Sequence, residues 1–352
     1  MGEESRVQAR FLLGPAGSGK TFRCLADIRA TLKTNPDGPP VAPEQGEGGP
    51  LILLAPKQAT FQLERQLLAA GDISGYTRLH IFSFDRLARF ILDNLHIAPP
   101  KLLSDEGRVM VLRALLMRHE EELELFGRSA RRPGFAQELS TLLNEFQRHQ
   151  FTPAKLRTLG KRGDLRHELR GKLHDLALLH ENYSRWLTEH QLQDTNCLLD
   201  FATGKLRAAI HDSRFTIHHL WLDGFAEMTP QELDLLAAIL PFCEKGTLAY
   251  CLDESGLAET SWLSIWSSVG KTFQQCRQRI ENLPGAKIET KFLPRQPEQS
   301  RFPENSALAA LEEGWARPLR APARPEPELA EPVLGAPTNP AIRIAACAHP
   351  EA

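Results

Sequence analysis

The chain has 352 residues, of which 42% are hydrophobic and 24% are charged, and its formal net charge is −2 at pH 7. This length allows two or three domains and a sizeable buried core, and the composition is that of an ordinary soluble protein. Because the net charge is close to zero, attraction of nucleic acid by the field of the whole molecule is excluded, and any DNA contact must come from a local patch.

Three apolar segments in the first hundred residues have the length and composition of buried strands. They are residues 9–13, 51–56 and 80–84, and each is followed by apolar residues at helical spacing. Strands that alternate with helices predict a parallel sheet with crossover helices. Residues 35–50 are crowded with proline and glycine, which predicts a loop or an insertion there.

The pattern changes between residues 101 and 212, where apolar residues recur at helical spacing and we find no strand-like run. We therefore predict an all-helical insertion. Within it, residues 155–172 carry seven Lys or Arg against two acids. This run could bind a DNA backbone, and a solvated helical face explains it equally well. The smaller cluster of Arg128, Arg131 and Arg132 has the same two interpretations.

Strand patterns return with residues 217–223, which end in Asp223, and with residues 246–252. Thr229 and Glu232 have the spacing of a capping box with Pro230 in the first turn, so a helix is predicted to begin there. Residues 317–340 contain seven prolines and predict an extended linker. The expected divisions are a first sheet part at 1–100, the helical insertion at 101–212, the return to the sheet at 213–316, the linker at 317–340, and the start of a truncated second domain at 341–352.

Six cysteines are scattered along the chain without a Cys-x-x-Cys pair. This pattern argues against a disulfide framework or a zinc knuckle and suits a reducing compartment. The first residues are acidic and lack an apolar run, so we expect no signal peptide. No stretch approaches the length of a membrane span. We therefore expect a cytoplasmic protein without membrane contact.

The segment after the first strand has the P-loop pattern of glycines followed by Lys20 and Thr21. Consecutive backbone N–H groups and the amino end of a helix converge there on phosphate, at a closeness that only glycine allows. Lys20 would reach the terminal phosphates, and Thr21 would hold Mg²⁺. We predict that a nucleotide binds to Gly14, Pro15, Ala16, Gly17, Ser18, Gly19, Lys20 and Thr21.

Asp223, at the end of a predicted strand, is the natural second magnesium ligand, acting through water. A helix cap or a turn would explain a lone aspartate as well. An efficient hydrolase usually has a glutamate next, to polarise the attacking water, whereas this chain has Gly224. Glu227 and Glu232 lie in a turn and a helix. We therefore expect nucleotide binding without fast hydrolysis, and we assign no catalytic residue.

Taken in order, these segments resemble the amino-terminal part of AddB-type subunits of the AddAB (RexAB-like) ATP-dependent helicase–nuclease. The resemblance rests on residues 11–21, 54–64, 82–88 and 222–225 and on the cap at Thr229, and it covers nearly the whole chain. It implies an α/β fold in which a P-loop RecA-like parallel sheet, as in the first domain of superfamily 1 helicases, is interrupted by the helical subdomain.

The resemblance also implies a role in double-strand break repair and recombination. It implies ATP and Mg²⁺ as cofactors, DNA as a ligand, and an AddA-type subunit as the partner that supplies the main motor of a heterodimer. The segments 56–60 and 82–84 lie where the helicase pattern grips single-stranded DNA. DNA contacts are therefore expected from Gln58, Thr60, Ser83 and Phe84, although Phe84 could equally be a core residue.

Members of this family continue through a second RecA-like domain and a nuclease domain whose iron–sulfur cluster is held by four cysteines. Neither has a counterpart in this sequence. We therefore expect a fragment or truncated product that is no nuclease by itself and holds no iron–sulfur cluster in this portion. Two alternatives stay open, namely a small P-loop phosphotransferase and a non-enzymatic DNA-binding or assembly module in which the P-loop only rigidifies the fold.

Overall fold

The computed structural model describes residues 7–33, 49–69, 71, 73, 75–132, 134–210, 215–254, 257, 264, 266–294 and 308. These residues form an α/β protein with a six-stranded sheet, a separate pair of two-residue strands and ten α-helices. The predicted linker at 317–340, the predicted segment at 341–352 and all but the last two residues of the predicted loop at 35–50 lie outside the described residues.

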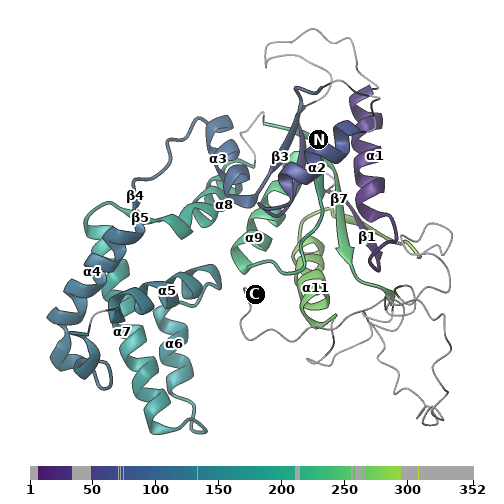
Figure 1. Ribbon diagram of the computed structural model, residues 1–352. Coiled ribbons are helices and arrows are strands. Elements are labelled where there is room, and N and C mark those ends of the chain that lie inside the picture. The colour runs from purple at the N-terminus through teal and green to yellow at the C-terminus, as the bar shows by residue number, and fades with distance from the viewer. Residues whose placement is uncertain are drawn as a thin grey trace, which may run out of the picture.

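Six strands lie in the order β3-β2-β6-β7-β1-β8, and every neighbouring pair is parallel, which confirms the predicted parallel sheet (Figure 1). All strands therefore end at the same edge. The inner strands are buried on both faces, which explains their near-continuous apolar runs. The strands are β1 (Gln8–Gly14), β2 (Leu51–Leu54), β3 (Leu79–Phe82), β6 (Ile217–Leu222), β7 (Cys243–Cys251) and β8 (Lys287–Phe292).

Helices pack against both faces of this sheet. On one face lie α1 (Lys20–Lys33) and α2 (Thr60–Ala69), and on the other lie α3 (Phe84–Asn94), α8 (Leu198–Ala209), α9 (Pro230–Ile239) and α11 (Ser267–Glu281). Alternate residues of β1 divide between the two cores, with Leu12 in the first and Phe11 and Leu13 in the second. The sheet is thus the middle layer of three.

The start of α9 is a capping box, as the sequence predicts. The hydroxyl of Thr229 accepts a hydrogen bond from the Glu232 N–H at 3.3 Å, and the Glu232 carboxylate accepts one from the Thr229 N–H at 2.8 Å. The elements α11 and β8 are absent from the sequence prediction. β8 is an edge strand whose residues alternate between exposed and half-buried, so it has no apolar run to reveal it.

Between β4 and β5 the chain forms a helical region with a core of its own (Figure 1). Its helices are α4 (Asp105–Arg118), α5 (Phe135–Arg148), α6 (Pro153–Gly160) and α7 (His167–Glu189). Their buried leucines and Tyr183 form a cluster that shares no residue with the two clusters at the sheet. None of the helices in the described ranges is long and apolar enough to cross a membrane.

The expectation that residues 101–212 contain no strand is wrong at one point. β4 (Leu102–Leu103) and β5 (Gln193–Asp194) pair in parallel where the chain enters and leaves the helical region. Two residues are too few to show a periodic pattern, and their pairing is set by tertiary contact. The helix α8 also falls within this segment, but its buried residues, such as Leu199 and Leu206, belong to the sheet core.

Candidate functional site

Residues 14–21 connect β1 to α1 at the edge where all strands of the sheet end. Gly17 and Gly19 have φ angles of 80° and 81°, in the left-handed region that favours glycine. A Cβ atom on Gly14 would lie 2.5 Å from the Leu293 carbonyl oxygen and from the Ser18 hydroxyl oxygen. The loop geometry therefore requires glycine at all three positions.

Lys20 is buried, and its ammonium group is directed back into this loop. Its Nζ donates hydrogen bonds to the carbonyl oxygens of Gly14 and Pro15, both at 2.7 Å, and to the Ser18 hydroxyl at 3.3 Å. Burial lowers the pKa of Lys20, while Cys251 and Asp223 nearby act in the opposite direction. The ammonium is thus held at the loop by weak neutral acceptors, which an anionic ligand can replace.

Thr21 and Asp223 meet although they are 202 residues apart in the sequence. The Thr21 hydroxyl donates to the Asp223 carboxylate at 2.6 Å. Asp223 directly follows β6, and its N–H donates to the Leu54 carbonyl oxygen at 3.0 Å. Burial raises the pKa of Asp223, and the hydrogen bond from Thr21 and the charge of Lys20 oppose that rise. A hydroxyl and a carboxylate are oxygen ligands of the kind that Mg²⁺ takes, so these residues fit the predicted metal.

The residue after Asp223 is held in a backbone conformation that a glutamate would strain. Gly224 has a φ angle of 84°, and a Cβ atom there would lie 3.3 Å from Cδ of Pro56. Glu232 is engaged in the cap of α9, and burial raises its pKa. Glu227 is exposed. The backbone conformation after β6 therefore favours Asp223-Gly224 over an Asp-Glu pair.

A cavity of about 430 Å³ opens where β2, β3 and β6 end. Three predicted DNA contacts, Gln58, Ser83 and Phe84, share it with the residues that follow Asp223. Thr60 lies outside this lining, and its hydroxyl donates to the Lys57 carbonyl oxygen at 3.1 Å in the first turn of α2. The complete lining is Ala55, Pro56, Lys57, Gln58, Ser83, Phe84, Asp85, Gly224, Phe225, Ala226, Glu227 and Glu232.

Phe84 is both a core residue and part of this lining, because it is buried and its ring meets the Phe225 ring edge-on at 5.3 Å. Sequence reasoning missed Phe225. The signal was available, since residues that directly follow parallel strands meet at one edge of the sheet. Through Phe225, the segment after Asp223 links the Thr21–Asp223 pair to the cavity.

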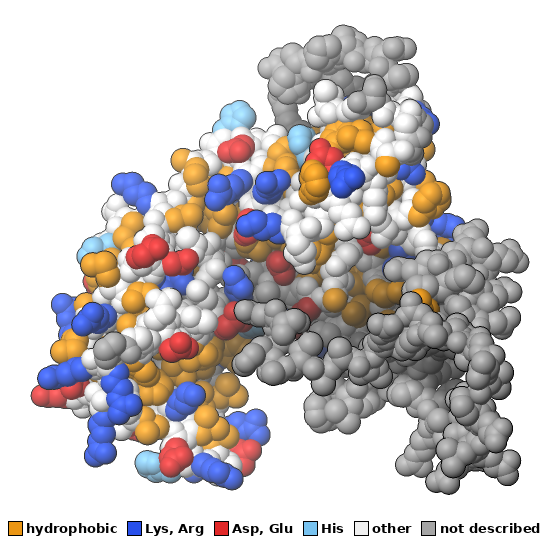
Figure 2. All heavy atoms as spheres, viewed as in Figure 1, with side chains coloured by type: hydrophobic (Ala, Val, Ile, Leu, Met, Phe, Trp, Pro, Cys, Tyr) orange, Lys and Arg blue, Asp and Glu red, His pale blue; other side chains and the backbone are white. Residues whose placement is uncertain are grey.

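The basic run at residues 155–172 is engaged largely in local contacts. Arg157 pairs with Glu181, Arg162 pairs with Asp164 at 2.9 Å, and Arg170 donates to the Leu165 carbonyl oxygen at 2.9 Å. In the visible face of Figure 2, Lys and Arg side chains are interspersed with Asp and Glu. These observations favour a solvated helical face over a DNA-binding run.

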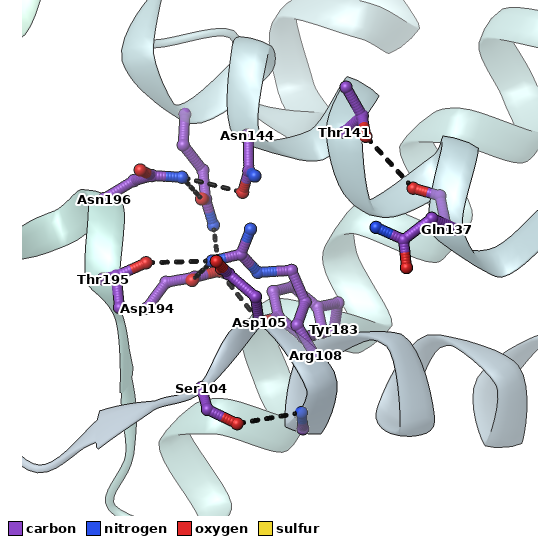
Figure 3. A network of polar contacts seen from close by, with 12 residues as sticks. Ser104, Asp105, Arg108, Gln137, Thr141, Asn144, Tyr183, Asp194, Thr195 and Asn196 are labelled. Atoms are coloured by element: carbon purple, nitrogen blue, oxygen red, sulfur yellow. Dashed lines mark hydrogen bonds and ion pairs between the residues drawn. The ribbon is translucent and has the colours of Figure 1, made fainter.

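A second polar cluster lies inside the helical region (Figure 3). Arg108 of α4 and Asp194 of β5 are fully buried and form an ion pair. The Asp194 carboxylate also accepts hydrogen bonds from the Tyr183 hydroxyl at 2.8 Å and from the Gln147 amide at 3.0 Å. This cluster ties α4, α5 and α7 to the strand by which the chain leaves the helical region.

A protein family described as ADDB, N-terminal matches residues 11–312 of this chain. Similar curated proteins are named as the B-type subunit of an ATP-dependent helicase/deoxyribonuclease. The one from Natranaerobius thermophilus is 32% identical over 319 residues, which is 88% of this chain and 26% of that protein. The one from Heliobacterium modesticaldum is 37% identical over 258 residues (72% and 20%), and the one from Desulforudis audaxviator is 36% identical over 334 residues (91% and 26%). The chain therefore spans a fifth to a quarter of the length of these relatives.

Proposed function

The chain belongs to the AddB family, and from this premise we propose that it is the nucleotide-binding and DNA-binding, helicase-like module of the B-type subunit of an ATP-dependent helicase/exonuclease in double-strand break repair and recombination. The observation that carries the proposal is the 2.6 Å hydrogen bond between Thr21 and Asp223. It joins the hydroxyl of the glycine-rich loop to the carboxylate that directly follows β6. A nucleotide–magnesium site uses a hydroxyl and a carboxylate in these two places.

In this proposal residues 14–21 form a P-loop that holds the triphosphate of ATP. The Lys20 ammonium would exchange its hydrogen bonds to the carbonyl oxygens of Gly14 and Pro15 for hydrogen bonds to phosphate oxygens. Thr21 supplies a direct ligand to Mg²⁺, and Asp223 supplies one through water. When bound there, Mg²⁺ would supply positive charge that offsets the charge of the phosphates.

We further propose a RecA-like first domain with a helical insertion. The parallel order of the sheet supports it, with β7 between the loop-bearing β1 and the Asp223-bearing β6. The separate core of α4 to α7 supports the insertion. The domain limits at residues 100, 212, 316 and 340 stay predictions.

We propose that the module binds ATP but turns it over slowly. The left-handed backbone at Gly224 disfavours the usual glutamate, and Glu232 is committed to the cap of α9. Because no carboxylate is placed to orient the attacking water, we expect the site to bind ATP and to hydrolyse it slowly.

Single-stranded DNA is proposed to lie over the cavity at the ends of β2, β3 and β6. The Gln58 amide and the Ser83 hydroxyl can hydrogen-bond nucleotides, and the half-buried Phe225 ring, which packs edge-on against the buried Phe84, can stack on a base. Thr60 is proposed as a backbone contact at the rim. Because the cavity and the nucleotide site share the segment after Asp223, binding at one affects the other.

The remaining parts of the proposal concern the longer protein. The relatives' names describe one subunit of a deoxyribonuclease, and the chain spans at most about a quarter of their length. We propose that the nuclease domain and its iron–sulfur cluster belong to the portion beyond this chain. We also propose an AddA-type partner subunit and a cytoplasmic location.

The test of nucleotide binding is calorimetric titration of Mg²⁺-ATP into the wild-type chain and the Lys20→Ala variant, followed by turnover assays with and without single-stranded DNA. We expect wild type to bind ATP, Lys20→Ala to lose at least tenfold in affinity, and turnover to stay near background. Fast DNA-stimulated turnover would contradict slow hydrolysis. Phosphoryl transfer to a small acceptor would contradict the helicase-like module.

The test of the DNA site compares Gln58→Ala with Gln62→Ala in fluorescence anisotropy with single-stranded oligonucleotides. Gln62 is an exposed residue of α2, four residues after Gln58, and lies outside the cavity lining, so it is the control. We expect a three- to tenfold loss of affinity for Gln58→Ala and no change for Gln62→Ala. Equal affinities for the two variants would move the DNA contact away from this cavity.

A further inference from the structure

Phe22, the residue after Thr21, is conspicuously exposed. Its side chain is 72% accessible, which with Met110 is the highest value among the large hydrophobic side chains of the described residues. It lies in the first turn of α1, directly after the loop at residues 14–21. An aromatic ring is thus presented to solvent beside the loop that suits phosphate.

The neighbouring side chains of the same turn are directed toward the loop and toward Asp223. Lys20 returns to the carbonyl oxygens of Gly14 and Pro15, and Thr21 reaches Asp223. Successive side chains of an α-helix leave it about 100° apart, so Phe22 points in a third direction. Its exposure shows that this direction leads out of the protein, on the outer side of the glycine-rich loop.

A glycine-rich loop recognises only phosphate, because its contacts come from backbone N–H groups and one ammonium. ATP, GTP and inorganic tripolyphosphate offer it the same oxygens. Discrimination between a nucleotide and a bare polyphosphate needs a group that contacts the base. An aromatic side chain supplies this by stacking, which every base accepts because every base has a π-face.

We propose that Phe22 stacks on the base of the nucleotide whose phosphates are held by residues 14–21. This inference rests on the proposed nucleotide binding and makes it more specific. The site takes nucleoside triphosphates of any base in preference to inorganic polyphosphate, and it discriminates only weakly between adenine and guanine.

Phe61 provides a matched control. Its side chain is 68% exposed and lies in the first turn of α2, with the Arg65 guanidinium 5.9 Å from its ring centre. It is therefore as accessible as Phe22 but does not follow the glycine-rich loop. Truncating either ring removes little buried contact, so both variants should fold.

The experiment is calorimetric titration of the full chain with Mg²⁺-ATP, Mg²⁺-GTP and Mg²⁺-tripolyphosphate. For Phe22→Ala we expect a five- to tenfold loss of affinity for both nucleotides and an unchanged affinity for tripolyphosphate. For Phe22→Trp the nucleotide affinities should be kept or increased. For Phe61→Ala all three affinities should equal those of wild type.

Two outcomes would overturn the stacking proposal while nucleotide binding itself stands. In the first, Phe22→Ala binds ATP with the affinity of wild type. In the second, it loses affinity for tripolyphosphate and for ATP to the same degree, which would mean that Phe22 supports the loop. Failure of the nucleotide-binding proposal has a different signature, since none of the three ligands would then bind to wild type. That result would remove the basis for stacking as well.

Discussion

The sheet region and the helical region both bury charged side chains, but the groups that these side chains contact differ. At the carboxyl edge of the sheet, Lys20 donates to the Gly14 carbonyl oxygen of the glycine-rich loop, and Asp223 accepts from the Thr21 hydroxyl. Inside the helical region, Arg108 and Asp194 are fully buried and pair with each other. In the first region the charges hydrogen-bond neutral groups, and we propose that they bind a nucleotide and its metal; in the second region they connect helices to one another.

Burial of a charge therefore does not by itself mark a functional site. Asp194 has three donors from three helices, so its bonding capacity is largely used within the fold. Asp223 accepts hydrogen bonds from the Thr21 hydroxyl and the Gly224 N–H, and it directly precedes Gly224 in the cavity lining. Unfolding and binding measurements on matched variants test this contrast.

The largest effect is expected for Arg108→Ala. Removing one partner of a buried ion pair leaves the Asp194 carboxylate without its counter-charge, which costs about 3–5 kcal/mol. Hydrogen exchange of α4 and α7 should report the loss, with ATP binding at the sheet retained. Arg131→Ala is the control, because its pair with Glu120 is exposed and worth less than about 1 kcal/mol. Loss of ATP binding in Arg108→Ala would show that the two regions are not independent.

The next effect is a pH dependence that arises from His219 in β6. Burial, with Lys245, His218 and Arg10 nearby, lowers the pKa of His219 to about 3. The native state keeps this ring neutral, whereas the unfolded state takes up a proton near pH 6.5. The neutral buried ring therefore costs no stability above pH 6.5, and the free energy of unfolding decreases as the pH drops from 6.5 toward 3.

For His219 the loss in the free energy of unfolding is about 1.4 kcal/mol per pH unit, or roughly 2 kcal/mol between pH 6.5 and 5. Urea unfolding of His219→Gln should show a shallower acid slope than wild type. His167→Gln, at the exposed start of α7, is the control and should leave the slope unchanged. Equal slopes in all three proteins would contradict a neutral buried His219.

A smaller effect is expected for Gly224→Ala. The left-handed φ angle of 84° makes any Cβ at this position cost about 1–2 kcal/mol. Gly163→Ala is the control, because a Cβ there meets nothing within 4 Å and its backbone has no positive φ. Thermal unfolding compares the two. Gly224→Glu should be destabilised similarly and gain no ATP turnover, and a gain would show that the missing carboxylate alone limits hydrolysis.

The smallest effect on stability is expected for Asp223→Asn, and Asp194→Asn is its counterpart in the helical region. Burial raises the pKa of Asp223, so the ionised group destabilises the ligand-free protein, and this cost is present above the folded pKa and vanishes below pH 3.8. At neutral pH, Asp223→Asn should therefore raise the melting temperature slightly and weaken Mg²⁺-ATP binding. Asp194→Asn should lower the melting temperature. The same sign for both variants would erase the distinction between the regions.

The parts of the fold that the sequence predicts are those with a local signal. β1, the glycine-rich loop and the cap of α9 are specified by apolar runs, glycine spacing and the Thr229–Glu232 pair. β8 could not be predicted, because an edge strand needs only half of its residues buried. The Arg108–Asp194 pair could not be predicted either, because 86 residues separate its members and neither belongs to a motif.

For the candidate site, sequence reasoning identified Lys20, Thr21 and Asp223 separately, and the structure brings them to one place. It identified Gln58, Ser83 and Phe84 through a family resemblance, and the structure puts all three in one cavity. It did not reveal Phe225 or the exposure of Phe22. Both depend on which direction a side chain takes at the end of a strand or in the first turn of a helix, and this is set by the backbone geometry.

The position of β1 in the sheet also bears on how the chain is made. β1 is the first of the strands in the described residues, and its neighbours in the sheet are β7 and β8, the last two of those strands. Ribosomes add roughly 5–20 residues per second, so the interval between the end of β1 at Gly14 and the start of β7 at Cys243 lasts on the order of ten to fifty seconds. Throughout that time both edges of β1 lack their native neighbours. The glycine-rich loop therefore acquires its shape late, after the whole helical region has left the ribosome.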